Sequence, residues 1–152
     1  MLTIRTANQD KDSLTITEHN CAMALETEGK ILNRDSAELG VKGLFDHPEF
    51  GFYLIASIED QPAASLMITY EWSDWRNGVF WWIQSVYVRK EFRRQRVYSA
   101  MYSELKRMAS ESKIPVCGFR LYAETENSGA QATYKGSGMD VCDYIMFEES
   151  CC

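Results

Sequence analysis

Three apolar segments in the middle of the chain, at 52–58, 63–72 and 79–88, are rich in β-branched and aromatic residues. Side chains of these types favour β-strands. Short polar segments at 59–62 and 73–78 separate the three runs and carry turn-forming residues. The pattern therefore predicts an antiparallel meander of three strands.

Two helices are predicted ahead of this meander. Residues 14–28 show a moderately helical pattern that begins after the polar pair at 12–13 and ends at Gly29. A second helix is expected from Asp35 to Phe45, with Asp35 or Ser36 as its cap. A helical pair therefore precedes the central strands.

The second half of the chain alternates helices and strands. Apolar side chains recur at spacings of four, four and three between Val97 and Met108, which places them on one face of a helix over 96–110. The other elements are expected at 116–123 (strand), 128–135 (helix) and 139–147 (strand), with an opening strand at 2–6. The resulting order, βααβββαβαβ, is typical of an α/β fold with a mixed sheet.

Length and charge restrict the class of protein. A chain of 152 residues with 45% hydrophobic content can bury one substantial core, so a single domain over 1–152 is predicted. The formal net charge of −6 argues against nucleic acid as a partner, because phosphate binding requires a basic surface. No stretch approaches the ~20 apolar residues that cross a bilayer, so we expect a cytoplasmic protein without a membrane partner.

The sulfur and imidazole side chains give no sign of a metal site. The five cysteines form no C-x-x-C pair, and the terminal Cys151-Cys152 is not preceded by the basic stretch typical of lipidation signals. His19 and His47 lie outside any ligand-spaced motif and are expected to be structural or exposed. We therefore expect reduced thiols and no metal.

The segment 85–102 joins a predicted strand to an amphipathic helix through a basic turn. The first N–H groups of a helix and the positive end of its dipole bind anions. Arg93, Arg94 and Arg96 add positive charge at this point of an otherwise acidic chain. The natural ligand of such a turn is a pyrophosphate.

A later segment carries a second ordered pattern, N-x-x-A-x-x-x-Y followed by a glycine and an apolar residue. It occupies Asn127, Ala130, Tyr134, Gly138 and Met139. With the basic turn, it resembles the GCN5-related N-acetyltransferase (GNAT) family, whose signature is an aromatic-valine strand end followed by R/Q-x-x-G-x-G/A at a helix start. Two matched segments in the right order extend this resemblance over nearly the whole chain.

The basic turn matches the family signature incompletely. Tyr87 and Val88 supply the aromatic-valine pair and Arg93 the first motif position, whereas Arg96 and Tyr98 stand at the two glycine positions. Glycine allows close backbone approach and positive φ, so Arg96 is the larger departure. Our hypothesis is that the charge of Arg96 partly compensates for the missing glycine.

The resemblance implies both a fold and a cosubstrate. The GNAT fold has a central mixed, mostly antiparallel sheet of six to seven strands flanked by about four helices. Its members bind acetyl-CoA without a metal and hydrogen-bond the pantetheine along the fourth strand. The implied coenzyme-binding residues are Val86, Tyr87, Val88, Arg93, Arg94, Gln95, Arg96, Val97, Tyr98, Ser99, Asn127 and Tyr134.

The implied reaction is direct attack of a primary amine on the thioester in a ternary complex. An N–H of Val86 or Val88 would face the developing oxyanion. Tyr134 matches the residue that protonates the leaving thiolate, and the alternative is that it packs under the last strand. An alkylamine with a pKa of ~10.4 must first lose a proton. The candidate bases, in order, are Glu71, Glu124 and Glu26.

All four tryptophans lie within residues 72–82, with acidic residues among them. An aromatic, acidic wall would hold a cationic or aromatic amine by charge and cation–π attraction. The candidate acceptor-binding residues are Trp72, Asp74, Trp75 and Trp82. An equally weighted alternative is a hairpin packed over the core or at a dimer interface.

Two other functions stay open. The altered turn could mark a noncatalytic sensor of acyl-CoA, although a sensor has no chemical need for Tyr134. An interaction protein would use the tryptophan-rich hairpin and bind no coenzyme. Within the enzyme hypothesis the acceptor is a small-molecule or peptide amine, and a homodimer stays open because family members often form dimers.

Overall fold

The structure is a computed structural model that describes residues 1–151. The chain divides into two compact units, Met1–Tyr122 and Ala123–Cys152, and each is described by itself. Cys152, one half of the terminal cysteine pair, lies outside the described residues. The single domain over 1–152 stays a prediction.

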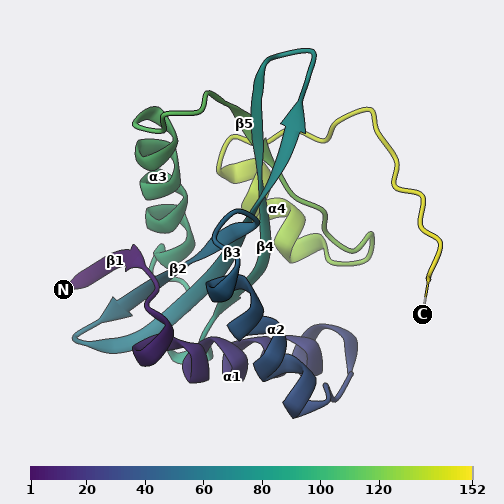
Figure 1. Ribbon diagram of the computed structural model, residues 1–152. Helices are drawn as coiled ribbons and strands as arrows, with labels where there is room; N and C mark the ends of the chain where they lie inside the picture. Colours follow the sequence, from purple (N-terminus) through teal and green to yellow (C-terminus); the bar gives the residue numbers. More distant parts are fainter. Residues whose placement is uncertain (152) are drawn as a thin grey trace. The chain divides into compact units, whose positions relative to one another are not determined.

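The first unit is built on one five-stranded sheet with the spatial order β1-β2-β3-β4-β5 (Figure 1). The first four strands are antiparallel to their neighbours, and β5 runs parallel to β4. The bounds are β1 Leu2–Thr6, β2 Gly51–Ile58, β3 Gln61–Ser73, β4 Gly78–Val88 and β5 Val116–Arg120. The sheet is mixed and mostly antiparallel as predicted, but the expected six to seven strands are wrong.

Both hairpins of the meander turn through residues in the left-handed conformation. Glu59 and Asp60 adopt left-handed φ values of 48° and 64° between β2 and β3. Asn77, with φ of 50°, precedes Gly78 at the β3–β4 turn. A Cβ at Gly78 would lie 2.6 Å from the carbonyl oxygen of Pro115, so a side chain is excluded there. The polar segments predicted as turns therefore are turns.

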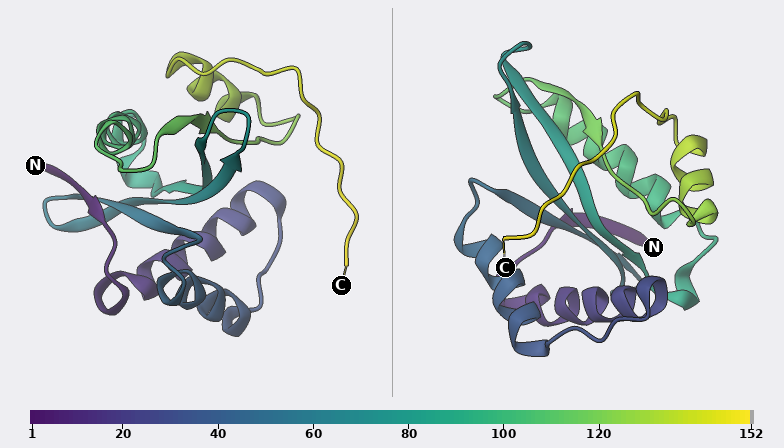
Figure 2. Two further views of the ribbon diagram at one scale, coloured as in Figure 1. Left: turned by 45° about the horizontal axis from the view of Figure 1, so that its top comes forward. Right: turned by 90° about the vertical axis from the view of Figure 1, so that its right-hand side faces the viewer.

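Two helices cover one face of the sheet and a third covers the other (Figure 2). The first face carries α1 (Gln9–Glu28) and α2 (Arg34–Asp46), and the second carries α3 (Val97–Ser110). A short 3-10 helix, Lys90–Phe92, precedes α3. The helical pair and the helix after the basic turn are confirmed.

The predicted helix caps are wrong. Asn8 caps α1, so this helix begins five residues before the predicted start. Asp12 is instead buried, where it binds both guanidinium nitrogens of Arg5 at 2.7 and 3.0 Å. Asn33, rather than Asp35 or Ser36, caps α2 by accepting from a backbone N–H. In both cases an asparagine a few residues earlier competes successfully for the free N–H groups.

The core has a layer on each face of the sheet. On the α1–α2 face, Ile16, Val41 and Tyr53 form a buried cluster. On the α3 face, the fully buried Met101 and Leu105 lie one helical turn apart. The apolar side chains that the sequence places on one face of this helix are therefore the ones that pack α3 against the sheet.

The second unit contains a single helix, α4 (Ser128–Gly136), in the described residues. Asn127 caps it by accepting from the Ala130 N–H at 3.1 Å. Residues 139–151 form neither helix nor strand, so the strand predicted at 139–147 is wrong. A strand requires a partner for its N–H and C=O groups, and the sequence pattern does not supply one.

His19 links α1 to the sheet. Its side chain is buried at 4% exposure, its Nδ1 lies 2.8 Å from the Ser65 Oγ on β3, and its ring contacts Tyr87. Burial, together with the positive charge of Arg89, lowers the pKa of His19 to about 4. His19 is thus structural as expected, and it is held in its neutral form.

This burial predicts acid sensitivity. Below the ordinary pKa of about 6.5 the unfolded chain protonates its histidine while the folded chain does not. The stabilisation is complete above that pH and is lost as pH falls toward 4. We expect a loss of about 2 kcal/mol at pH 5, measured by denaturant unfolding. His19→Gln should reduce this loss and His47→Gln should not; identical pH dependence in both variants would contradict the assignment.

Candidate active site

The strands β4 and β5 stop pairing partway along the sheet. Their ladder runs from Val79 opposite Val116 to Trp82 opposite Arg120. In the described part of the chain, β4 continues for six more residues without pairing to β5, whereas β3 pairs with it to Val88. One edge of the β4 main chain is therefore open beyond Trp82.

The backbone directions show which groups face this open edge. The Arg89 N–H donates to the carbonyl of Ala63 in β3 at 2.9 Å. N–H groups alternate in direction along a strand, so those of Val86 and Val88 face away from β3. Two of the residues predicted to bind the coenzyme thus present main-chain groups at the open edge.

A bulge lies at the point where this edge begins. Ser85 adopts a left-handed φ of 52°, and the β3–β4 register shifts beside it, between Ser65 and Met67. A bulge of this kind bends the strand and redirects its side chains. The sequence predicted no bulge, because serine carries no signal for a left-handed conformation within a strand.

The basic turn follows directly and is held by α1. The Arg93 guanidinium donates to the Val88 carbonyl at 2.9 Å and to Glu26 at 2.8 Å. Lys90 lies 3.5 Å from the same carboxylate. The Arg93 hydrogen bond and charge hold the pKa of Glu26 below its ordinary value. Glu26, a third-choice base in the sequence, therefore positions the turn.

The start of α3 has the geometry of an anion site. Arg96, at the first missing glycine, adopts the left-handed φ of 59° that glycine would favour. In the described part of the chain no side chain caps the helix, and Arg94 and Gln95 are exposed beside it. Tyr98, at the second position, is buried and stacks on Tyr102. Neither departure prevents the turn from forming.

A polar cluster lies where β4 and β5 part. Glu71 accepts from the Trp82 indole at 2.7 Å and from Arg120 at 3.0 Å. The Arg120 guanidinium also lies 3.6 Å from the Phe80 ring centre. The Glu71 side chain remains 40% exposed. The sequence singled out Glu71 and Trp82 but not Arg120, because nothing local pairs residues 49 positions apart.

The structure does not gather the tryptophans into one wall. Trp82 borders the polar cluster, whereas Trp81 is buried against Phe119 on the other face. Trp75 is 88% exposed in the hairpin turn, and Asp74 is exposed beside it. Trp72 follows Glu71 in β3, so its side chain points to the opposite face. Of the four predicted acceptor residues, only Trp82 adjoins Glu71.

The second unit holds the other two predicted coenzyme residues. Asn127 serves as the cap of α4. Tyr134 lies in the same helix and is half-buried, and this burial raises the pKa of its phenol above the ordinary value. A phenol is protonated at neutral pH with or without this shift, so burial by itself does not mark Tyr134 as a proton donor.

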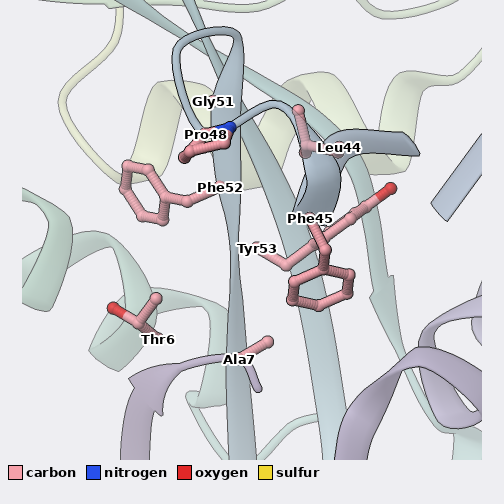
Figure 3. A pocket seen from close by; sticks show the side chains of 8 residues that line it. All are labelled: Thr6, Ala7, Leu44, Phe45, Pro48, Gly51, Phe52 and Tyr53. Carbon is pink, nitrogen blue, oxygen red and sulfur yellow. The ribbon is translucent and has the colours of Figure 1, made fainter. Parts of the chain in front are cut away.

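A small apolar pocket lies at the β1–β2 side of the first unit (Figure 3), with a volume of about 160 Å³. Its walls are almost wholly carbon and offer little to orient an amine. The lining residues are Thr6, Ala7, Leu44, Phe45, Pro48, Gly51, Phe52 and Tyr53. No residue of β4 or β5 lines this pocket, so it does not include the open edge.

Residues 1–151 show neither a metal-binding group nor a membrane-spanning helix. No group of three or more metal-ligating side chains gathers there. No helix in the same residues has the length and apolar character to span a membrane. The predicted cytoplasmic location stays a prediction.

Sequence comparison gives one family. Residues 14–139 match the model of the acetyltransferase (GNAT) family. No curated protein sequence matches the chain significantly.

Solved structures agree with that family. A possible acetyltransferase from Clostridium difficile 630 is 43% identical, with a TM-score of 0.91 over 100% of this chain and 99% of that one. A predicted acetyltransferase from Clostridium acetobutylicum, solved with acetyl-CoA, is 18% identical over 98% and 96%, with a TM-score of 0.77. AAC(6')-Iy, with a CoA-linked bisubstrate analogue of acetylneamine, is 13% identical over 100% and 99%, with a TM-score of 0.75.

The left-handed conformation of Arg96 predicts that glycine stabilises the folded chain at this position, although glycine usually destabilises a helix. A left-handed residue with a Cβ costs roughly 1–2 kcal/mol, which glycine avoids. We expect Arg96→Gly to exceed Arg96→Ala in free energy of unfolding by about 1 kcal/mol, as measured in urea. The same pair at Ser99, inside α3, should show the opposite order. A less stable Arg96→Gly variant would contradict the left-handed conformation.

Proposed function

Because the chain belongs to the acetyltransferase (GNAT) family, we propose that it transfers the acetyl group of acetyl-CoA to a primary amine. The observation that carries the proposal is the open main-chain edge of β4, which leads directly into the basic turn at the start of α3. Binding of coenzyme A in the solved relatives supports it.

The open edge of β4 suits the pantetheine of the coenzyme, and the basic turn suits its pyrophosphate. Pantetheine carries amide groups that can pair with Val86 and Val88 as a neighbouring strand would. The N–H groups at the start of α3 and the exposed Arg94 and Arg96 suit a pyrophosphate. Arg93 holds the turn closed through the Val88 carbonyl, so it also shapes the site.

The same edge can stabilise the transition state. When an amine attacks the thioester, negative charge develops on the carbonyl oxygen. An N–H of Val86 or Val88 directed at that oxygen would contribute roughly 3–4 kcal/mol, as oxyanion-hole donors do elsewhere. Because these groups are fixed in a strand, they need no rearrangement during the reaction.

The departing thiolate requires a proton donor, and Tyr134 is the residue proposed for it. Its position in the N-x-x-A-x-x-x-Y pattern supports this role, and its phenol carries a proton at neutral pH. The proton on its oxygen would pass to the coenzyme sulfur as the carbon–sulfur bond breaks. A sensor without transfer chemistry would have no use for this group.

Glu71 is proposed to accept the proton of the amine through water. Val86 lies four positions after Trp82, the neighbour of Glu71, which is a distance of about 13 Å at ~3.3 Å per residue. A direct contact with the reacting carbon is therefore too long. The exposed part of the carboxylate can receive the proton through a chain of several water molecules.

The acceptor is proposed to be cationic. Trp82 offers an aromatic face where the open edge begins, and the exposed part of the Glu71 carboxylate, which is also paired with Arg120, offers acceptor oxygens. The aminoglycoside part of the analogue bound to AAC(6')-Iy is an amine of this kind, although that protein shares only the fold with this chain. A small-molecule amine is thus the first acceptor class to test.

The proposal is tested by calorimetric titration with acetyl-CoA and mass spectrometry of a mixed panel of amines incubated with it. We expect binding and a mass increase of one acetyl group on cationic amines. Binding without transfer to any amine would favour the noncatalytic sensor. Absence of binding would overturn the proposal.

Tyr134→Phe should separate chemistry from binding. Removing the phenol oxygen leaves the ring packing in place, so coenzyme affinity should hold while kcat falls about 100-fold or more. The control is Tyr70→Phe on the opposite face from Glu71, which should retain full kcat. An unchanged kcat in Tyr134→Phe would remove this residue from the mechanism.

Glu71→Gln should make the rate depend on amine ionisation. An amide cannot take the proton, so kcat/KM at pH 7 should fall about 100-fold and recover as pH rises toward the amine pKa. Glu104→Gln, which also breaks an arginine ion pair, is the matched control. A parallel pH–rate profile in wild type and Glu71→Gln would show that Glu71 is no base.

A further inference from the structure

Asn20 lies on the side of α1 that faces the sheet. Its neighbours on that side of the helix, Ile16, His19 and Ala24, are all buried. The Oδ1 atom of Asn20 is buried as well, yet it accepts no hydrogen bond from any residue of 1–151. A buried amide oxygen without a partner destabilises the folded chain, so folded proteins contain few of them. The presence of this one indicates a use other than stability.

The contacts of the neighbouring residues on α1 show which part of the sheet Asn20 faces. Ile16, one helical turn earlier, belongs to the same buried cluster as Tyr53 of β2. His19, the preceding residue, lies 2.8 Å from the hydroxyl of Ser65 on β3. Asn20 therefore faces the sheet between these two contacts.

A row of side chains crosses the sheet at this level. Tyr53 pairs with Met67 of β3, and Met67 pairs with Gln84 of β4. Residues directly opposite each other on antiparallel strands point to the same face, and Met67 packs against the cluster on the α1–α2 face. The row ends at Gln84, one residue before the bulge at Ser85 and two before Val86. It therefore leads to the open edge of β4.

The row is only partly covered on the α1–α2 face. Met67, Thr69 and Gln84 remain partly exposed there. By contrast, Ile68 and Ile83, which alternate with them along the strands, are buried on the α3 face. A ligand can thus reach the row from the side of the sheet on which α1 lies.

Two further polar groups of the row are available to a ligand. The Tyr53 hydroxyl forms no hydrogen bond in the described part of the chain, although the residue is only 4% exposed. The Gln84 oxygen accepts from the Thr69 hydroxyl at 2.9 Å, and the amide N–H groups of Gln84 have no acceptor within residues 1–151. A phenol and an amide nitrogen donate hydrogen bonds, whereas the Asn20 oxygen accepts one. Together the three groups match a ligand that carries both a donor and an acceptor.

We propose that Asn20, Tyr53 and Gln84 bind the acceptor, and that this acceptor is a primary amine with a hydroxyl group beside its amine. The inference rests on the proposed acetyl transfer. Asn20 accepts one N–H of the amine, and the Tyr53 and Gln84 donors bind the hydroxyl oxygen. The last torsion of an asparagine side chain has a broad, two-fold preference, so its oxygen can turn toward the ligand.

This subsite favours the form of the amine that can attack. Its three side chains are uncharged, and His19, whose pKa burial lowers to about 4, is neutral beside them. Surroundings without a counter-ion disfavour an ammonium ion, so the amine loses its proton more readily there. With one N–H held by Asn20, the lone pair of the nitrogen is available to the thioester carbon. The acceptor can thus arrive as a cation beside Glu71 and react as a neutral amine beside Val86.

Asn20→Leu tests the role of the buried oxygen. Leucine is apolar and of similar shape, so it removes a group that has no partner in the free protein. We expect an unchanged or higher midpoint of urea unfolding and an unchanged affinity for acetyl-CoA in calorimetry. The kcat/KM for 2-aminoethanol should fall about tenfold or more, because the amine loses its hydrogen-bond acceptor. Asn20→Ala removes the same oxygen without added volume and should lose kcat/KM to a similar extent.

Asn33→Leu is the matched control. The Asn33 oxygen already accepts the N–H of Ser36 at the start of α2, so this variant should lower the urea midpoint and leave kcat/KM unchanged. Retention of kcat/KM in both Asn20 variants, or a loss of acetyl-CoA affinity as large as the loss of kcat/KM, would overturn the proposal.

A pair of amines tests the acceptor class. 2-Aminoethanol and propylamine have the same number of heavy atoms, but only the first carries a hydroxyl group. Their kcat/KM ratio is compared between wild type and Tyr53→Phe, so that their different basicities cancel. We expect the preference for 2-aminoethanol to fall about fivefold or more in Tyr53→Phe. It should stay unchanged in Tyr70→Phe, whose side chain lies on the opposite face.

The outcomes separate this subsite from the proposed function. An equal preference in wild type and Tyr53→Phe, with transfer intact, would overturn the subsite alone. Transfer to other amines of the panel but not to 2-aminoethanol would show that the acceptor class is wrong. Absence of transfer to any amine would refute the acetyl transfer itself.

Discussion

The separation of β4 from β5 after the Trp82–Arg120 pair is the constraint on which the site depends. A main chain paired on both sides has no hydrogen-bonding groups to offer a ligand. Because β5 leaves the ladder early, the second half of β4 remains a strand, held by β3, while its other edge stays open. The β3–β4 ladder holds this part of β4 rigid, and because no β4–β5 ladder is formed there, its other main-chain groups are free to bind a ligand.

The remaining features of the first unit hold that edge in place. The bulge at Ser85 sets where the strand bends, and Arg93 ties the Val88 carbonyl to the following turn. Behind the strand, α1 supplies His19 to Ser65 and Glu26 to Arg93. The buried neutral imidazole and the ion pair thus connect one helix to both the strand and the phosphate-binding turn. A substitution of His19 or Glu26 in α1 would therefore disturb β3 or the basic turn directly, through a lost hydrogen bond or ion pair.

Much of this arrangement could be predicted from the sequence, and the failures share a physical cause. The turn residues and the one-face spacing of α3 are local signals, so the elements of the first unit were found. Residues 139–147 are predicted as a strand because their side chains favour one. A strand also needs a neighbouring strand to pair with, and the sequence does not show which strand that would be. The Glu71–Arg120 pair and the bulge at Ser85 were missed for the same reason, since each depends on neighbouring strands.

The most direct measurement of the central claim is residue-resolved amide hydrogen exchange with and without acetyl-CoA. We expect the amides of Val86 and Val88 to exchange readily in the free protein and to slow at least tenfold on binding. The Tyr87 amide, which faces β3, should be protected in both states and serves as the internal control. Coenzyme binding that leaves the Val86 and Val88 amides unprotected would contradict the claim that the open edge of β4 is the binding surface.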